Sequence, residues 1–190
     1  MVIILLQSVL EAQIMQKLRY VIGLPVLETE TGMQIGEIAE VIVDIEAAFV
    51  CGFILTGTNW FASESIITFE DLFSLGRDAI MIRNQHVVRQ LDTLIHVSNK
   101  YYLRDLFDKQ IFTDSGLRLG VLADIFFDGI TGEIKWYQVS DSIITDLLYG
   151  RMMMPLPQVQ TVGEDNVIVP EGMIKLLHTE TEIAETQRLF

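Results

Sequence analysis

Residues 31–44 read TGMQIGEIAEVIVD, and residues 115–128 read SGLRLGVLADIFFD. Placed one above the other without a gap, the two stretches are offset by 116 − 32 = 84 residues. Self-similarity at a fixed spacing is the signature of a repeated structural unit. The alignment therefore indicates that one small module occurs twice. Its apolar positions agree in kind, and four pairs are identical: Gly32/Gly116, Gly36/Gly120, Ala39/Ala123 and Asp44/Asp128.

A second block repeats further along the chain. The stretch LGRDAIMI at 75–82 matches VGEDNVIV at 162–169, offset by 163 − 76 = 87 residues. The difference, 87 − 84 = 3, places three extra residues between the two blocks of the second copy. Because the two blocks recur in the same order, they predict a tandem duplication of the whole module.

Each copy is predicted to be rich in β-structure. Thr-Gly at 31–32 and Ser-Gly at 115–116 are hairpin signals, since glycine accepts the positive φ of tight turns. The residues that follow alternate in polarity as a strand does, and Gly36 and Gly120 inside these strands indicate a bulge or a tight bend. Further short strands are expected at 50–56 and 66–69, and at 133–139 and 154–157. Five or six short strands at this spacing are typical of a small barrel.

Helices are expected outside this pattern. Val88 and Leu91 lie on one stripe of a predicted helix from Gln85 to Asn99, with Asn84 as its cap. A second helix is expected at 140–149, in the second copy alone. The predicted organisation is an N-terminal extension (1–17), a first repeat (18–83), a helical linker (84–101), a second repeat (102–170) and a partly helical tail (171–190). Within the extension, residues 1–14 are either an amphipathic helix or a start assigned too early.

The composition narrows the classes of partner. Half of the residues are hydrophobic, and the formal net charge is −13. A uniformly acidic chain repels phosphate backbones and anionic lipid, so direct nucleic-acid binding is not expected, and a basic protein partner fits better. No apolar run reaches the ~20 residues that span a bilayer, and a cytoplasmic location is expected. The single Cys51 excludes an internal disulfide and fits a buried thiol.

The glycine and turn positions of the first copy follow a recognisable order: IGLPV at 22–26, TG at 31–32, IG at 35–36, GF at 52–53 and GRD at 76–78. This order resembles the PRC-barrel domain, whose fold is similar to the cytoplasmic domain of the photosynthetic reaction-centre H subunit and to the C-terminal domain of a ribosome maturation factor. The resemblance covers 18–83 and 102–170, although the second copy has Lys109-Gln110 where the first has Pro25-Val26. It implies a mainly β protein, two small PRC-type barrels in tandem joined by a helical linker, with short accessory helices. Such a pattern specifies fold better than function.

Candidate catalytic groups are few. The repeated carboxylates Asp44 and Asp128 could perform acid–base work or bind a metal ion, but an aspartate at a strand end also bonds its own backbone in a turn, and the turn interpretation is preferred. The three histidines, at positions 86, 96 and 178, lack the spacing of metal ligands. We therefore expect no enzyme activity, no metal site and no cofactor.

Four residues are candidate partner contacts. Trp60 and Trp136 each precede a second aromatic residue, and Met152 and Met153 belong to the run RMMMPLP at 151–157. Aromatic side chains anchor interfaces and methionine adapts to varied surfaces, although alternate methionines also fit a strand that enters the barrel. The sequence thus favours a non-catalytic protein-interaction or assembly protein, with homodimerisation left open. The alternative is a small-ligand or metal-binding protein that uses a crevice between the barrels.

Overall fold

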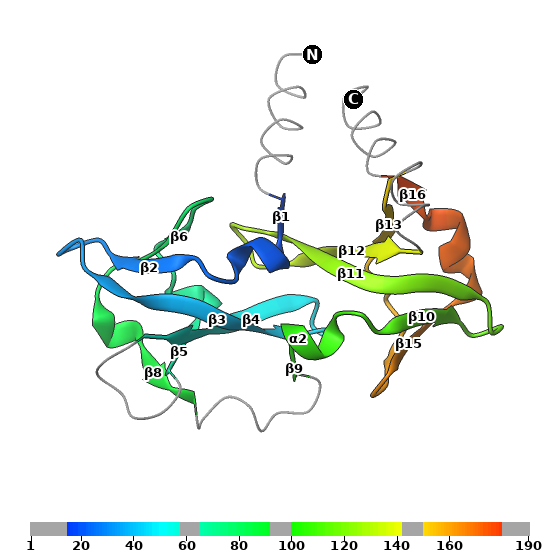
Figure 1. Cartoon of the computed structure of the whole chain (residues 1–190), viewed down its shortest axis with the longest axis horizontal. Coiled ribbons are helices and arrows are strands. Elements are labelled where there is room, and N and C mark those ends of the chain that lie inside the picture. The colour runs from blue at the N-terminus through cyan, green and yellow to red at the C-terminus, as the bar shows by residue number, and fades with distance from the viewer. Residues whose placement is uncertain (1–14, 58–64, 92–99, 142–149, 180–190) are drawn as a thin grey trace, which may run out of the picture. The chain divides into compact units, whose positions relative to one another are not determined.

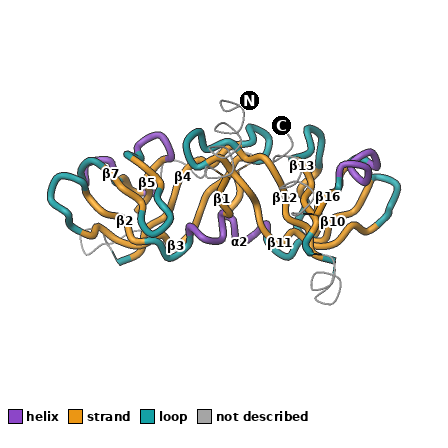
Figure 2. The backbone as a smooth tube through the Cα atoms, turned by 90° about the horizontal axis from the view of Figure 1, so that it is seen from above, coloured by secondary structure: helices purple, strands orange, loops and turns teal. Residues whose placement is uncertain are grey.

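The computed structural model describes residues 15–57, 65–91, 100–141 and 150–179. The chain divides into two compact units. The first-repeat unit holds Lys17–Asp105 together with Phe127–Ile134, and the second-repeat unit holds Met1–Gln16, Leu106–Phe126 and Lys135–Phe190. Within the described ranges each unit is built on one eight-stranded sheet. Strands dominate both units, and the helices between them are short (Figures 1 and 2). The predicted mainly β fold is confirmed.

The sheet of the first-repeat unit has the strand order β6-β7-β2-β3-β4-β5-β8, and β9 also pairs with β3 (Figure 1). Short 3-10 helices, η1 (Leu18–Val21), η2 (Phe69–Asp71) and η3 (Gln85–Val87), connect its strands. The strands are β2 (Pro25–Glu28), β3 (Gln34–Asp44), β4 (Phe49–Thr56), β5 (Ser65–Thr68), β6 (Ser74–Leu75), β7 (Ile80–Ile82), β8 (Arg89–Gln90) and β9 (Lys100–Tyr102).

The sheet of the second-repeat unit repeats this plan in the order β14-β15-β10-β11-β12-β13-β16, and β1 also pairs with β11. One turn of helix, α2 (Leu103–Leu106), precedes β10, and the 3-10 helix η5 (Glu171–Leu176) precedes β16. The strands are β1 (Met15–Lys17), β10 (Gln110–Thr113), β11 (Arg118–Asp128), β12 (Ile134–Ser140), β13 (Met152–Pro155), β14 (Thr161–Val162), β15 (Asn166–Val169) and β16 (His178–Thr179).

Equivalent residues of the two repeats occupy equivalent places in their sheets. In the turn that precedes β7 the Gly76 N–H donates to the Ala79 carbonyl at 2.9 Å, and before β15 the Gly163 N–H donates to the Asn166 carbonyl at 2.8 Å. The aligned apolar pairs are buried in both sheets, with at most 3% exposure: Val50/Ile134, Phe53/Tyr137 and Leu55/Val139. The strand pattern read from the repeat is therefore also the packing pattern.

The expected bulges lie next to the two strand glycines. The β2–β3 register passes from Val26↔Gly36 to Leu27↔Gln34, which leaves Ile35 unpaired on that side. The β10–β11 register makes the same jump at Gly120. Gly120 has φ +145°, a region that L side chains rarely adopt. Glycine at this position thus lets a long strand bend without backbone strain.

The long strand β3 pairs with two partners along one of its edges. β3 pairs with β2 through Gln34–Glu37 and with β9 through Ile42–Asp44, while β4 occupies its other edge. β9 lies where the linker meets the second repeat, yet it completes the sheet of the first repeat. β1 lies in the segment that precedes the first repeat and pairs with β11 of the second. An eleven-residue strand is long enough for both partners.

The first-repeat unit also contains a hairpin of the second repeat, residues 127–134. Phe49 and Glu133 form an antiparallel bridge. On either side of it the Val50 N–H donates to the Gly132 carbonyl at 2.9 Å, and the Ile134 N–H donates to the Ala48 carbonyl at 2.8 Å. Each of these pairs joins equivalent positions of the repeat or their neighbours, because 133 − 49 = 84. We call this pairing of 48–50 with 132–134 the seam.

The aromatic core of the first-repeat unit extends into the second repeat. The Phe69 ring lies with its centroid 5.6 Å from that of Phe49 and 6.2 Å from that of Phe53. It also meets Phe127 of the second repeat edge-on, at 6.4 Å. Phe127 is fully buried. A core side chain of this unit therefore comes from the other repeat.

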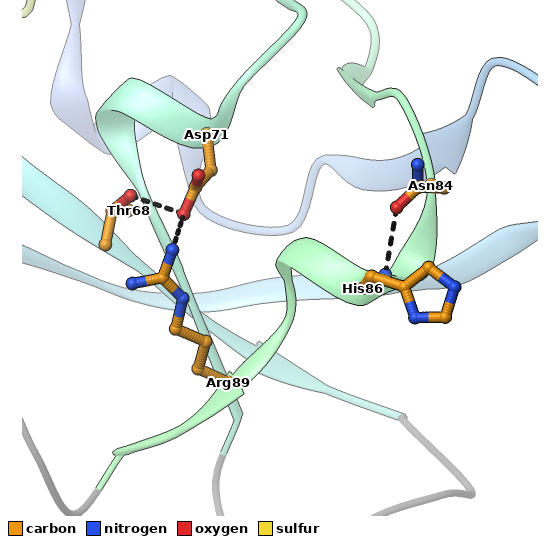
Figure 3. A network of polar contacts seen from close by, with 5 residues as sticks. All are labelled: Thr68, Asp71, Asn84, His86 and Arg89. Carbon is orange, nitrogen blue, oxygen red and sulfur yellow. Dashed lines mark hydrogen bonds and ion pairs between the residues drawn. The ribbon is translucent and has the colours of Figure 1, made fainter.

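The predicted helix from Gln85 to Asn99 is wrong over its described part. Asn84 does cap a first turn, since its Oδ1 accepts from the His86 N–H at 3.2 Å, but η3 ends at Val87 and the chain continues as strand β8 (Figure 3). β8 pairs with the edge of β5, and the Arg89 guanidinium donates to Asp71 Oδ2 at 3.0 Å. Val88 and Leu91 are buried as predicted. As a strand, β8 pairs with backbone groups at the edge of β5, which a helix at this position would leave without a strand partner.

Other helical predictions fall partly or wholly outside the described residues. These are the N-terminal residues 1–14, the later part of the linker (92–99), residues 142–149 of the second repeat and the end of the tail (180–190). The described part of the tail holds η5 and β16, so it combines a 3-10 helix with a short strand. None of the helices in the described ranges is long and apolar enough to cross a membrane.

The seam hairpins place one residue each in the left-handed region. Ala48 has φ +55° and the equivalent Gly132 has φ +80°. A left-handed alanine destabilises the folded state by about 1–2 kcal/mol. Glycine avoids this strain but loses more conformational entropy on folding, which offsets about 0.5–1 kcal/mol of the gain. We expect Ala48→Gly to raise the free energy of unfolding, measured by urea titration, by roughly 0.5–1 kcal/mol. Gly132→Ala should lower it, because a Cβ there would lie 2.9 Å from the Phe49 and Phe69 rings. A destabilised Ala48→Gly variant would contradict this account of the turn.

Candidate interaction surface

The structure separates the predicted partner contacts. Trp60 lies outside the described residues. Trp136 is half-buried on β12 opposite Pro155, whereas Met152 is half-buried on β13 opposite Val139. Successive side chains of a strand point to opposite faces, so Trp136 and Met152 lie on opposite faces of the sheet. They do not form one surface.

The rest of the methionine run belongs to the core. Met153 is 4% exposed opposite Gln138, and Met154 is fully buried opposite Tyr137. The Tyr137 hydroxyl donates to Gln160 Oε1 at 3.0 Å, which satisfies its polar end. β13 is therefore a strand, as the alternative interpretation of the methionines predicts, but its buried methionines are consecutive and lie on both faces rather than on one.

The repeated aspartates have structural partners. Asp44 Oδ1 accepts from the Ala47 N–H at 2.8 Å. Asp128 Oδ1 accepts from the Ile130 and Thr131 N–H groups at 2.8 and 2.9 Å. Both carboxylates thus organise the hairpin turn that follows β3 or β11. In the described ranges, no three His, Cys, Asp or Glu side chains gather in a way that could hold a metal ion.

Another pair of repeated acids went unnoticed in the sequence. Glu40 and Asp124 are equivalent, since 124 − 40 = 84, and they are 5% and 2% exposed. Each accepts a hydrogen bond at 2.9 Å from the next N–H along its strand, that of Val41 or Ile125. Glu40 also lies 3.6 Å from the Arg104 guanidinium. The recurrence of an acid between apolar strand residues was the signal that could have identified this pair.

A repeated apolar pair lies on the outer face of each sheet. In the first-repeat unit Leu27 of β2 is in parallel register with Met81 of β7. Both are half-buried, whereas their strand neighbours Val26, Ile80 and Ile82 point into the core and are fully buried. Leu27 and Met81 are therefore adjacent on the face that points away from the core.

The second-repeat unit carries the same feature. Phe112 of β10 is in parallel register with Ile168 of β15, again between buried neighbours. Ile168 is 36% exposed and Phe112 is half-buried. We call Leu27 with Met81, and Phe112 with Ile168, the outer-face pairs. The aligned apolar positions Met81 and Ile168 were visible in the sequence, but their outward direction was not.

Further apolar side chains are exposed elsewhere on the same units. Phe73 is 53% exposed next to β6, and the Arg83 guanidinium lies 5.0 Å from its ring centroid. Met33 and Leu117 are equivalent residues between the first two strands of each sheet, and they are 49% and 51% exposed. An exposed apolar residue thus recurs in the same hairpin of both repeats.

A groove of about 310 Å³ lies at the bulge of β3. It is lined by Gln34, Ile35, Gly36, Glu37, Thr56 and Gly57. Two of these lining side chains are bonded to each other, since Gln34 Nε2 donates to Glu37 Oε1 at 3.3 Å. The groove belongs to the first-repeat unit alone, so it is not the crevice between barrels that the ligand-binding alternative requires.

Next to Leu27, the Glu28 carboxylate is held by donors. The Thr31 hydroxyl donates to one of its oxygens, and the Gln85 N–H donates to the other at 2.8 Å. These bonds, the first more than the second, lower the pKa of Glu28 below its ordinary value. Glu28 is 6% exposed and joins the β2–β3 hairpin to η3.

A depressed pKa makes the contribution of Glu28 to stability dependent on pH. That contribution is complete above the ordinary value of 4.5 and is lost as the pH falls through the lower folded-state pKa. We expect Glu28→Gln to be less stable than the wild type at pH 7 and to lose less stability on acidification. Thr31→Val removes one donor to Glu28 and should likewise reduce the loss of unfolding free energy on acidification. Urea titrations from pH 7 to below 4.5 measure it, and parallel profiles for Glu28→Gln and wild type would refute this role.

Cys51 packs against a buried cluster of Ile42, Ile54, Ile66 and Leu91. Burial raises the pKa of its thiol above the ordinary value of 9.0, although the nearby Lys100 charge opposes the shift. Since the thiolate is the reactive form, we expect iodoacetamide to label native Cys51 much more slowly at pH 7 than the urea-unfolded chain. Labelling of the native protein at the unfolded rate would contradict the packing described.

The comparisons with known proteins agree with the repeat. The family model of the PRC-barrel domain matches residues 15–88 and, a second time, residues 98–172. A search of curated proteins found no match to the chain.

Proposed function

Because the chain belongs to the PRC-barrel domain family and carries the domain twice, we propose that it is a non-catalytic protein-interaction or assembly protein. PRC-barrel domains occur in assembly- and adaptor-type proteins. The polar residues that recur in both repeats support the non-catalytic part, since Asp44 and Asp128 bond their own turns. Glu40 and Asp124 are buried within their strands.

The main support for the proposal is that each repeat carries one of the outer-face pairs. Two adjacent apolar side chains point outward at the same place on each sheet, although the repeats differ in sequence there. A few well-packed residues near the centre of an interface contribute most of its binding energy. Two equivalent surfaces in one chain can bind one partner at two points, which raises the overall affinity without any new type of contact.

The charge of the chain indicates the character of the partner. A net charge of −13 favours association with a basic protein surface and opposes association with nucleic acid or anionic lipid. The proposed contact is therefore apolar at its centre, with long-range attraction from acidic residues elsewhere on the protein.

Affinity capture from native extract tests the proposal. Wild-type chain is compared with Met81→Thr, Ile168→Thr and the double variant, since threonine is polar but, as a β-branched residue, is well accepted in strands. Val159→Thr, at a loop position that is 73% exposed, is the control for general loss of surface apolarity. We expect a partner whose recovery falls at least tenfold with the double variant, less with each single variant, and not with the control. A partner retained equally by all four variants would refute the outer-face pairs as the binding surface.

A further inference from the structure

The seam of the first-repeat unit pairs equivalent segments of the two repeats, 48–50 and 132–134. Phe49 faces its own equivalent, Glu133, and the two flanking hydrogen bonds run once in each direction. A contact between equivalent positions of two related modules is isologous, which is the form found in symmetric dimers. Here the second module is supplied by the same chain.

The surface of the first repeat that contacts the 127–134 hairpin fits it closely. Gly132 lies so near the Phe49 and Phe69 rings that a Cβ would be 2.9 Å from both. Phe127 fills the space beside Phe69 and is fully buried. The Phe49 ring, the Phe69 ring and the Ala48–Val50 backbone thus form a surface that recognises a hairpin with glycine at its fifth position, as in DGITG at 128–132.

We propose that the seam is also a docking surface for a second copy of this chain. In the exchanged dimer the 127–134 hairpin of the first copy lies against Ala48–Val50 of the second copy. The 127–134 hairpin of the second copy lies against Ala48–Val50 of the first in the same way. Every hydrogen bond and ring contact of the seam is kept, so the two forms differ in connectivity rather than in contacts. The outer-face pairs take no part in this exchange.

The balance between the two forms follows from concentration. A tethered module experiences an effective concentration on the order of millimolar, so a chain at micromolar concentration closes on itself. Refolding at about 1 mM allows a second copy to compete with the tether. Because exchange requires the seam to open, a dimer formed in this way should persist after dilution.

Cysteine pairs report which copy supplies the hairpin. Phe49 and Glu133 are a non-hydrogen-bonded antiparallel pair, a geometry with Cα atoms about 4.5 Å apart that accepts a disulfide. In a Cys51→Ala background, one tagged chain carries Phe49→Cys and a differently tagged chain carries Glu133→Cys. They are unfolded together, refolded at about 1 mM, diluted and then oxidised. A chain with Val159→Cys replaces the Glu133→Cys chain as the control for random collision.

We expect a disulfide between the two tags in the co-refolded sample, and none above the control when the chains are refolded apart and then mixed. The double variant, Phe49→Cys with Glu133→Cys, should form its disulfide within one chain after refolding at micromolar concentration. It loses the Phe49 ring, but the two backbone hydrogen bonds and the contact of Phe69 with Phe127 remain to hold the hairpin. If that internal disulfide forms but the mixed one does not exceed the control, exchange is refuted. If the internal disulfide fails to form, the seam itself is wrong and the proposal falls with it. Either failure leaves the partner proposal standing, because that is read from Met81 and Ile168.

Discussion

Replacing Phe127 with alanine is expected to lower the free energy of unfolding by about 3–5 kcal/mol, the usual cost of deleting a buried phenyl ring. Phe127 is fully buried against Phe69, whose ring also contacts Phe49 and Phe53. The cavity would therefore open in the core of the first-repeat unit, although the substitution is in the second repeat. Loss of protection should appear at the amides of β3 and β4.

Urea denaturation gives the size of the Phe127→Ala effect, and hydrogen exchange gives its location. The matched control is Phe126→Ala, since Phe126 is the preceding residue of β11 and is only half-buried. We expect the control to lose clearly less stability and to leave β4 protected. Equal losses for the two variants, or exchange changes confined to the second-repeat unit, would show that Phe127 does not belong to the core of the first.

Gly120→Ala is the second substitution with a large expected effect. Its Cβ would lie 2.5 Å from the Ser140 carbonyl oxygen and 2.8 Å from the Val139 side chain. Such overpacking costs roughly 1–3 kcal/mol, and the positive φ of Gly120 adds about 1–3 kcal/mol for a residue that carries a Cβ. The expected loss is thus about 2–6 kcal/mol, the sum of the two ranges.

The control for Gly120→Ala is Gly172→Ala in η5, where a Cβ would meet no atom within 4 Å. That variant should unfold within about 0.5 kcal/mol of the wild type, as exposed substitutions usually do. Thermal or urea unfolding of both variants measures the difference. A Gly120→Ala protein as stable as Gly172→Ala would mean that the bulge of β11 does not approach β12 as described.

The sequence predicted the fold because the features that determine it are local and occur twice. Gly36 and Gly120 identified the bulges, and the pairs Gly76/Ala79 and Gly163/Asn166 form the turns that the second block indicated. The alternation of apolar residues correctly assigned Phe53 and Tyr137 to the core.

What the sequence did not predict depends on contacts between distant segments. The spacing of Val88 and Leu91 is compatible with a helix or with a strand at a sheet edge. The segment is a strand because it pairs with the edge of β5. The pairing of β9 with β3 could not be predicted from periodicity either, because a local pattern does not indicate which repeat's sheet a strand joins.

The outer-face pairs were not predicted from the sequence. Trp136 and Met152 were selected by residue type alone, and their positions on paired strands place them on opposite faces. Leu27 and Phe112 gave no signal of their own, since an apolar residue in a strand suggests the core. Their outward direction became visible only once β2–β7 and β10–β15 were paired in register.

Residues of both repeats form the hydrogen-bonded seam of the first-repeat unit. Native-state hydrogen exchange at two amides, followed by NMR, tests this pairing. The Val50 N–H donates to Gly132 and the Ile134 N–H donates to Ala48. We predict that both exchange slowly, with similar opening free energies, and that Phe127→Ala accelerates both. Exchange of either amide at the rate of an unstructured peptide would contradict the seam.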